Sequence, residues 1–366
     1  MTRLRMAVIG VGHLGQHHAR ILAGMPDVEL VGVADANSDQ ARAIAAKLST
    51  APYSSFEPLV GRVDAVSIVT PTIYHHQVAA AFLRAGVPVL VEKPVCRTVA
   101  EADELIRLAA TAGVPFQVGH IERFNPAFEE LIKRPICPKF IEAERHGPFT
   151  GRSIDIGAVL DLMIHDLDLL LSLVGSPVRS VSAVGAAVFG GHEDMVNARL
   201  EFENGCIAHV TASRITRLPK RRLRIWAPEG YAGIDFVTRK LILVQQSEEV
   251  RRQGLRVDQL DAAAKARLKD EVFGRYLQVL NLDGDRKGDQ LTAELKHFVH
   301  CVRTGSRPRV SGEDGRNALE LAERVLTAVR NHPWNGTADG PLGPEGLPKP
   351  VGYLFPPMQI ARPDAA

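Results

Sequence analysis

The first third of the chain alternates short apolar runs with amphipathic stretches, and this rhythm constrains the fold more than any other feature. The apolar runs predict strands at Met6–Gly10, Val28–Ala34, Ala65–Thr70, Val87–Val91 and Phe116–Gly119. Helical periodicity lies between them, at Gly15–Ala23, Ser38–Leu48, His75–Ala85 and Val99–Ala112. Such alternation is typical of a parallel sheet with right-handed crossovers, and continuously apolar strands indicate helices on both faces. We therefore expect an α/β, doubly wound nucleotide-binding domain over residues 1–122.

A second domain is expected over residues 123–332, because 366 residues exceed one typical core. A helix at Pro126–Lys133, a strand at Phe140–Arg145 and an acidic helix at Val159–Leu173 begin it. Alternating strands follow, and Asn204-Gly205 between two of them is a strong hairpin signal. The remaining predicted elements are the strands Ala198–Glu203, Cys206–Ser213, Arg222–Ala227, Ala232–Val237 and Lys240–Gln245, and the helices Gln290–Arg303 and Glu313–Arg330. This pattern predicts an α+β domain with an antiparallel sheet.

Composition and charge exclude several classes of protein. The net charge of +2 is too small to indicate nucleic acid or an acidic membrane as partner. The most apolar stretch, 159–174, contains Asp161, His165, Asp166 and Asp168, so it cannot span a membrane. Four scattered cysteines favour a reducing, cytoplasmic location. Residues 333–366 contain 8 Pro and 5 Gly, which indicates an extended tail, although Tyr353-Leu354-Phe355 leaves packing on the body or on a partner open.

A glycine-rich turn predicts the cofactor. Gly10-Val11-Gly12-His13-Leu14-Gly15 follows the first strand and opens a helix, where backbone N–H groups and the helix dipole favour a pyrophosphate. Asp35 ends the second strand, and a carboxylate there accepts hydrogen bonds from ribose hydroxyls but repels a 2′-phosphate. NAD is therefore expected, and Arg42 keeps NADP open. The predicted cofactor-binding residues are Gly10, Gly12, His13, Leu14, Gly15, Asp35, Thr70, Pro71, His75 and Glu92, with helix capping as an equal alternative for His75.

The predicted chemistry rests on three ionisable residues. Pro94 restricts the backbone of Lys93, so the amine of this side chain extends from a defined position directly after the fourth predicted strand. Asp161 and His165 are spaced i, i+4 and share one face of a helix. A histidine can take a hydroxyl proton, the aspartate can orient it, and the lysine can stabilise an alkoxide. The alternative is a buried Asp–His pair that only packs the helix. We predict no metal, because the lysine supplies the cationic electrophile.

These motifs together resemble the Gfo/Idh/MocA oxidoreductases, from Gly10–Gly15 and Asp35 through Thr70-Pro71 and Glu92-Lys93-Pro94 to Asp161-x-x-x-His165. The resemblance covers the chain to about Arg330. It implies a Rossmann domain followed by a domain with a large open antiparallel sheet, and catalytic roles for Lys93, Asp161 and His165. It also implies a cis Lys93-Pro94 peptide and dimers or tetramers that form through the sheet.

A narrower resemblance suggests the substrate. The segments Val118–Pro126 and Leu160–Asp168 look like the branch that oxidises the 3-hydroxyl of UDP-N-acetylglucosamine to a ketone, which an aminotransferase then converts to an amine for a lipid A precursor. Predicted substrate-binding residues are Arg123, Asn125, Arg152 and Asp168. Arginine forks onto phosphate, so Arg145 and the basic run Arg214, Arg217, Lys220, Arg221, Arg222 and Arg224 are further candidates for the diphosphate. A solvated strand edge explains that run equally well.

Two other functions stay open at this point. One is a dehydrogenase or reductase of a free sugar or inositol, with the same catalytic residues in a different pocket. The other is a regulator that binds the cofactor without turnover, against which the three ionisable residues argue.

The hairpin strand Cys206–Ser213 predicts self-association. Its Cys206, Ala208, Val210 and Ala212 alternate with Ile207, His209, Thr211 and Ser213, so both of its sides are only mildly polar. Such a strand suits burial against a second copy, and closed two-fold symmetry is the commonest arrangement. We expect a homodimer or homotetramer.

Overall fold

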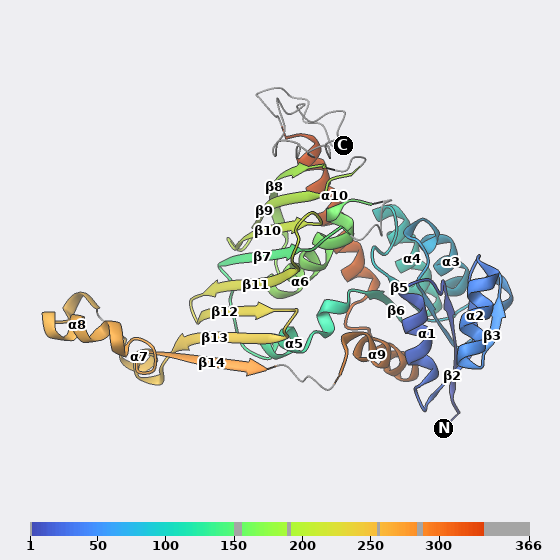
Figure 1. Ribbon diagram of the computed structural model, residues 1–366, viewed down its shortest axis with the longest axis horizontal. Helices are drawn as coiled ribbons and strands as arrows, with labels where there is room; N and C mark the ends of the chain where they lie inside the picture. The colour runs from blue at the N-terminus through green and yellow to red at the C-terminus, as the bar shows by residue number, and fades with distance from the viewer. Residues whose placement is uncertain (1, 150–155, 189–191, 255–256, 284–287, 333–366) are drawn as a thin grey trace, which may run out of the picture.

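A computed structural model describes residues 2–149, 156–188, 192–254, 257–283 and 288–332. The chain forms a six-stranded sheet and an eight-stranded sheet, which lie side by side in Figure 1. The α/β prediction with two sheets is confirmed. Arg152 and the predicted tail at 333–366 lie outside the described residues.

The first sheet is the predicted Rossmann sheet. Its strands are all parallel and lie in the order β3-β2-β1-β4-β5-β6. Their bounds are β1 Leu4–Ile9, β2 Val28–Ala34, β3 Ala51–Tyr53, β4 Ala65–Ile68, β5 Val89–Glu92 and β6 Phe116–Gly119. The strand order reverses between β1 and β4, and the carboxyl ends of strands at such a point form a ligand crevice. The strand β3 was not predicted, because it is only three residues long and contains Pro52.

Helices cover both faces of this sheet, as the continuously apolar strands predict. Met6 and Val8 pack with α1 (Gly15–Ala23) and α2 (Ser38–Leu48). The alternate residues Ala7 and Ile9 pack with α3 (Thr72–Arg84) and α4 (Val99–Ala112). The helix that was predicted to begin at His75 begins three residues earlier, at Thr72, directly after Pro71.

The second sheet is mixed and mostly antiparallel, in the order β14-β13-β12-β11-β7-β10-β9-β8. The predicted antiparallel sheet is confirmed with one difference, because β7 and β10 pair in parallel. The predicted hairpin is confirmed, with Gly205 at φ 83° between β9 and β10. The strands are β7 Phe140–His146, β8 Val178–Ala186, β9 Met195–Phe202, β10 Ile207–Ser213, β11 Lys220–Ala227, β12 Gly230–Asp235, β13 Lys240–Gln246 and β14 Leu277–Asp283.

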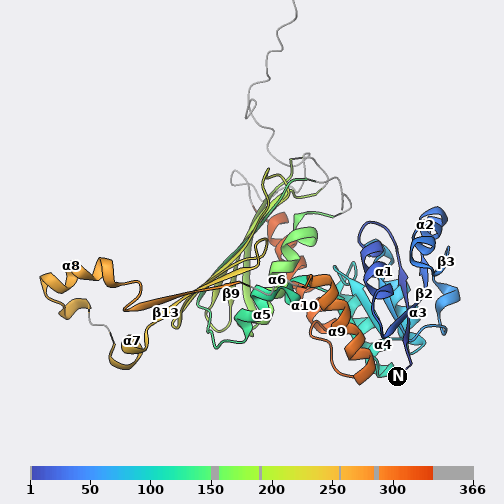
Figure 2. The same cartoon turned by 60° about the horizontal axis from the view of Figure 1, so that its bottom comes forward.

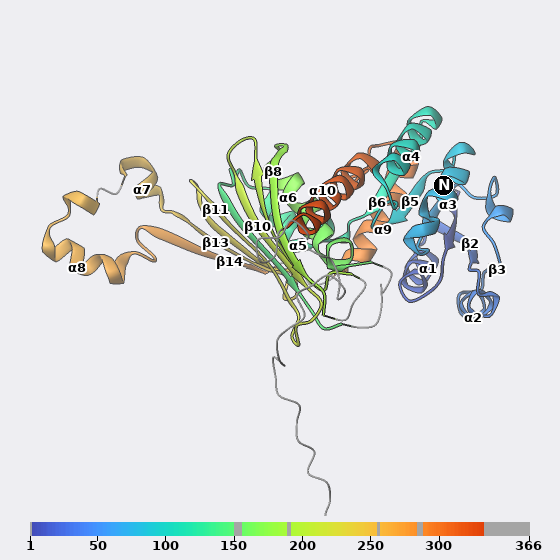
Figure 3. The same cartoon turned by 90° about the horizontal axis from the view of Figure 1, so that it is seen from above.

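One face of the second sheet packs on helices. The short helices η2 (Ile121–Phe124) and α5 (Pro126–Ile132) lead into this domain. Residues of α5, of α6 (Ile164–Val174) and of α10 (Gly312–Arg330) form a common core with the sheet, and Figure 3 shows these helices on one side of it. No helix from the described part of the chain covers the central strands on the opposite side. The sheet is therefore open on one face.

Two features of this half differ from the predicted elements. The helix α9 (Gln290–Thr304) was predicted to close the second domain, but its Leu295 and Phe298 pack with α1 and β1 of the first. The strands β13 and β14 continue into an arm that carries α7 (Glu248–Gln253), η4 (Val257–Gln259) and α8 (Ala262–Glu271), standing away from the body in Figure 2. The helices of this arm are polar and lack apolar periodicity, so the sequence pattern does not predict them, and β14 was not predicted either.

Candidate active site

A cleft of about 700 Å³ lies between the two domains. Both domains line it, through the carboxyl ends of β4 and β5 on one side and η3 (Val159–Met163), α6, β7 and the segments beside β10 and β11 on the other. The structure thus brings together eight of the predicted cofactor-binding and catalytic residues, namely His13, Leu14, Thr70, Pro71, Glu92, Lys93, Asp161 and His165.

The glycine-rich turn has the shape of a pyrophosphate cradle. Gly10 has φ 85°, and a Cβ on Gly15 would lie 1.8 Å from the carbonyl oxygen of Gly10, so the helix needs a glycine to pack this closely. A Cβ on Gly12 would meet nothing within 4 Å. Open space beside Gly12, at the start of α1, fits the close approach of a dinucleotide phosphate.

Asp35 is fixed at the end of β2. One carboxylate oxygen accepts a hydrogen bond from the N–H of Val11 at 2.9 Å, and the other accepts one from Asn37 at 2.9 Å. These bonds hold the carboxylate beside the glycine-rich turn. Arg42, the residue that left NADP open, pairs with Asp39 at 2.5 Å.

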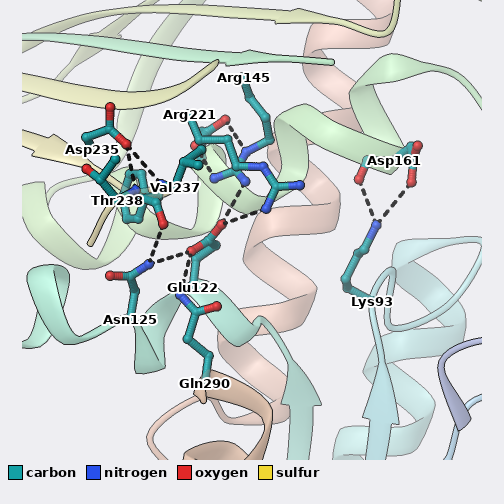
Figure 4. Close-up of polar contacts among 12 residues, drawn as sticks. Lys93, Glu122, Asn125, Arg145, Asp161, Arg221, Asp235, Val237, Thr238 and Gln290 are labelled. Carbon is teal, nitrogen blue, oxygen red and sulfur yellow. Dashed lines mark hydrogen bonds and ion pairs between the residues drawn. The ribbon is translucent and has the colours of Figure 1, made fainter. Parts of the chain in front are cut away.

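Lys93 and Asp161 meet across the cleft (Figure 4). Nζ of Lys93 donates to the backbone carbonyl of Asp161 at 2.7 Å and lies 3.4 Å from its carboxylate Oδ1. The Lys93-Pro94 peptide is cis, as the family resemblance implies.

The predicted partnership of Asp161 with His165 is not what the structure shows. Asp161 lies in a π-helical turn, Val159–Met163, and His165 lies in the α-helix that follows. A π turn carries more residues than an α turn, so i, i+4 spacing does not place two side chains on one line. Within the part of the chain that the structure describes, Nδ1 of His165 is buried without a hydrogen-bond partner. Lys93, rather than His165, is the contact of Asp161.

His165 is set up to be neutral. Burial lowers the pKa of its imidazole well below 6.5, and the positive charges of Lys93, Arg145 and Arg221 lower it further. A neutral imidazole has a lone pair with which to accept a proton. The cations that lower the pKa also make the protonated form costly, so a proton accepted here leaves readily.

His75 is held by the backbone behind the cleft, and its predicted contact with the cofactor stays a prediction. Its ring is 1% exposed, and its two nitrogens lie 2.8 Å from the carbonyl oxygens of Pro94 and Thr70. The pKa of His75 is lowered by burial, against the effect of these two carbonyls. The side chain therefore ties the turn after β4 to the turn after β5, behind the cleft.

Three predicted substrate-binding residues lie outside the cleft lining. Arg123 forms a buried ion pair with Asp168, with N···O distances of 2.7 and 2.9 Å. Asn125 is fully buried, where it caps α5 through the N–H of Ala127 and donates to Glu122. Their partners within the fold account for these side chains. Arg152 lies outside the described residues.

The arginines of the second sheet divide by strand alternation. Arg145 is buried and donates to Asp166 at 2.8 and 2.9 Å and to Glu122 at 2.8 Å (Figure 4). Burial lowers the pKa of its guanidinium, but the two carboxylates outweigh that effect, so the pKa is raised. Arg145 pairs across the strands with Arg221, and both line the cleft with Arg214. The alternate residues Lys220 and Arg224 pair with Glu144 on β7. β11 lies between β12 and β7, so the explanation of the run as a strand edge is wrong, whereas Arg145, Arg214 and Arg221 stay candidates for the diphosphate.

Sequence reasoning missed a second set of buried polar residues. His120, directly after β6, is 1% exposed, and neither ring nitrogen has a hydrogen-bond partner among the described residues. His18 is fully buried against Ser67 and Glu92, and Glu294 on α9 is also fully buried. Of these three residues, His18 alone had a signal in the sequence, because helical periodicity places it on the buried face of α1.

Among the described residues, no group of three or more His, Cys, Asp or Glu side chains could hold a metal ion. No helix in the same part of the chain is long and apolar enough to cross a membrane.

Comparison with known proteins gives the same picture along the chain. Residues 4–120 match the model of an oxidoreductase family with an NAD-binding Rossmann fold, and residues 139–232 match the GFO/IDH/MocA C-terminal domain. The UDP-N-acetylglucosamine 3-dehydrogenase of Acidithiobacillus ferrooxidans is 37% identical over 90% of this chain and 98% of its own. Its solved structure has a TM-score of 0.79. The scyllo-inositol 2-dehydrogenase (NAD(+)) of Bacillus subtilis is 26% identical, over 90% of this chain and 95% of its own.

The neutral state of His120 predicts a dependence of stability on pH. Burial lowers its pKa, so below the unfolded value of about 6.5 the unfolded chain binds a proton that the folded chain does not. This contribution to stability is present above pH 6.5 and is lost as the pH falls. His120→Leu should therefore reduce the pH dependence of the unfolding free energy by up to about 1.4 kcal/mol per pH unit between pH 6.5 and 5.

Urea unfolding at several pH values measures this slope. His300→Leu, at an exposed histidine of α9, is the matched control and should leave the slope unchanged. Equal slopes in wild type and His120→Leu would contradict the assignment.

Proposed function

Since this chain belongs to the Gfo/Idh/MocA family of oxidoreductases, we propose that it oxidises the 3-hydroxyl of a UDP-amino sugar, UDP-N-acetylglucosamine, to a ketone with NAD. The product would enter lipid A or another cell-surface glycan. We assign residues 1–122 to cofactor binding and 123–332 to substrate binding and oligomerisation. The observation that carries the proposal is the pairing of Lys93 with Asp161 in a cleft that also holds a neutral His165 and begins at the glycine-rich turn.

The side chains of the cleft divide the work of alcohol oxidation. NAD, when bound, supplies a hydride acceptor. His165 accepts the hydroxyl proton, because it is neutral at physiological pH. The Lys93 ammonium, oriented by the carbonyl and carboxylate of Asp161, donates a hydrogen bond to the oxygen on which negative charge develops. Asp161 thus acts on Lys93 and not on His165.

A nucleotide-sugar substrate needs partners for its diphosphate, and the second sheet provides guanidinium groups in the cleft. The side chain of Arg221 is 50% exposed and lies 4.0 Å from Glu122, the acid it approaches. Arg214 stacks over Phe149 and is oriented by Asp194. One guanidinium group can donate two parallel hydrogen bonds to the oxygens of a phosphate. The 37% identity to a UDP-N-acetylglucosamine 3-dehydrogenase over nearly the whole chain supports the same substrate.

NAD is preferred over NADP in this proposal. Asp35 places a carboxylate beside the glycine-rich turn, where it would repel a 2′-phosphate. The four cysteines are unpaired, which supports a cytoplasmic location.

The open face of the second sheet supports a homodimer or homotetramer. Aromatic rings gather there, with Trp226 5.4 Å from Phe140 and 5.3 Å from Tyr231 between centroids, and Trp226 is 37% exposed. Neighbouring charges already pair across strands, as Arg224 does with Glu142. Removing water from such a face costs little free energy, so a second copy of the same face can cover it.

The substrate class is tested by turnover of a panel, followed as NADH absorbance. UDP-N-acetylglucosamine with NAD should give the highest kcat/KM, because the cleft offers Arg214 and Arg221 to the diphosphate and Asp35 offers a carboxylate to the ribose of the cofactor. NADP, free N-acetylglucosamine and inositols should each be poorer. A higher kcat/KM for an inositol would instead favour an inositol dehydrogenase, the activity named for the 26% identical protein of Bacillus subtilis.

The catalytic assignment predicts two different mutant profiles. Lys93→Met should lower kcat by about 10²-fold or more while NAD still binds, since it removes a charged stabiliser. The acid limb of wild-type kcat/KM should lie below pH 6.5, because the pKa of the base is depressed, and His165→Asn should remove that limb. If the limb survives in His165→Asn and vanishes in Lys93→Met, the two roles must be exchanged.

Assembly is tested by light scattering at micromolar concentration. We expect at least twice the chain mass of 39.8 kDa. Thr211→Lys should weaken the oligomer, because it places a charge on the open face beside Asn197. Gln77→Lys, at an exposed position of α3, is the matched control. A monomeric wild type would refute the proposal.

A further inference from the structure

A buried chain of polar contacts runs from α1 to the backbone of Lys93. His18 is fully buried, with Nδ1 2.9 Å from the hydroxyl of Ser67 on β4. Its Nε2 lies 3.2 Å from Oε1 of Glu92, within ion-pair distance although off the line of an ideal hydrogen bond. Oε2 of Glu92 accepts the backbone N–H of Lys93 at 3.2 Å. Glu92 therefore lies between the imidazole and the proposed catalytic lysine.

The chemistry of the partners fixes the hydrogen of His18 that faces Glu92. An ionised carboxylate only accepts hydrogen bonds, so Nε2 must carry a proton on that side. Nδ1 meets the Ser67 hydroxyl, which can rotate to donate or to accept. Both nitrogens therefore face polar groups, which a histidine that only fills space would not need.

The surroundings of Glu92 keep it ionised and in one place. Burial alone would raise its pKa, but His18, the charge of Lys93 and the Lys93 N–H together lower it. On the β6 side a Cβ at Gly119 would lie 2.9 Å from the carboxylate, so the glycine provides the space that Glu92 occupies. On the α9 side burial and the charge of Glu92 raise the pKa of Glu294 well above its usual value, so Glu294 is neutral and adds no repulsion.

We propose that His18 is a positioning residue for the reaction, holding Glu92 through Nε2 so that Glu92 holds the backbone from which the Lys93 amine extends. This inference rests on the proposed role of Lys93. It also joins the helix that follows the glycine-rich turn to the reacting amine, because His18 belongs to α1. A shift of the amine by about 1 Å is enough to cost about 10²-fold in rate.

Two substitutions of His18 separate positioning from packing. The amide nitrogen of glutamine reaches the place of Nε2, whereas that of asparagine reaches only the place of Nδ1. We expect His18→Asn to lower kcat by roughly 10- to 100-fold with the sugar KM almost unchanged, and His18→Gln to keep most of the activity. Equal kcat in the two variants, or a wild-type kcat in His18→Asn, would overturn the inference. His300→Gln is the control at an exposed histidine.

A second readout uses the protein without cofactor. The rate at which an acylating reagent labels Lys93, followed by mass spectrometry, should rise in His18→Asn, where the backbone is less restrained, and stay at the wild-type value in His18→Gln. If His18→Asn does not fold, Ser67→Ala removes only the hydroxyl that orients the ring, and it should show a smaller change of the same kind. Unchanged kcat and unchanged labelling in Ser67→Ala would then count against the inference.

Lys93→Met in the same assay distinguishes the two levels of the account. If Lys93→Met retains turnover, the proposed function of the lysine fails and the positioning inference falls with it. If Lys93→Met is inactive and His18→Asn is fully active, only the positioning inference fails.

Discussion

The contact of Lys93 with Asp161 is the interaction on which the rest of the site depends. It joins the end of β5 in the Rossmann sheet to the π-helical turn of the second domain, across the cleft where a cofactor and a sugar would meet. Neither domain alone contains both groups. The relative position of the domains is therefore part of the chemistry, and the helices α9 and α10, which follow the second sheet in the chain but pack partly on the first domain, help to hold that position.

Buried charges support the cleft from behind. Arg145 is held between Asp166 and Glu122, and Glu122 also meets Asn125 and Gln290, so one network links β7, α6, η2 and α9 (Figure 4). Buried ion pairs of this kind add little net stability, but breaking one leaves an unpaired charge at high cost. Such a network restricts the arrangement of the elements that carry His165 and Arg221. The positive charge of Arg145 also lowers the pKa of His165, in addition to the larger effect of burial.

Much of this could be predicted from the sequence because it depends on local patterns. Strand–helix alternation located the Rossmann sheet, and Lys93, Asp161 and His165 reach one cleft as expected. The sequence could not show that a π turn would direct Asp161 to Lys93 rather than to His165, because that depends on backbone geometry. Nor could it show that Arg123 would pair with Asp168, or that Glu294 would approach Glu92, since these partners are 45 and 202 positions apart along the chain and meet only through tertiary packing.

The central claim is that the cleft removes hydride from carbon 3 of a UDP-amino sugar. The most direct test uses UDP-N-acetylglucosamine deuterated at carbon 3, incubated with the protein and NAD, with mass spectrometry of both products. The account predicts that the deuterium appears in the nicotinamide ring of the reduced cofactor and that the sugar product is an unlabelled ketone. Deuterium that stays in the sugar while reduced cofactor accumulates would show oxidation at another carbon and would contradict the account.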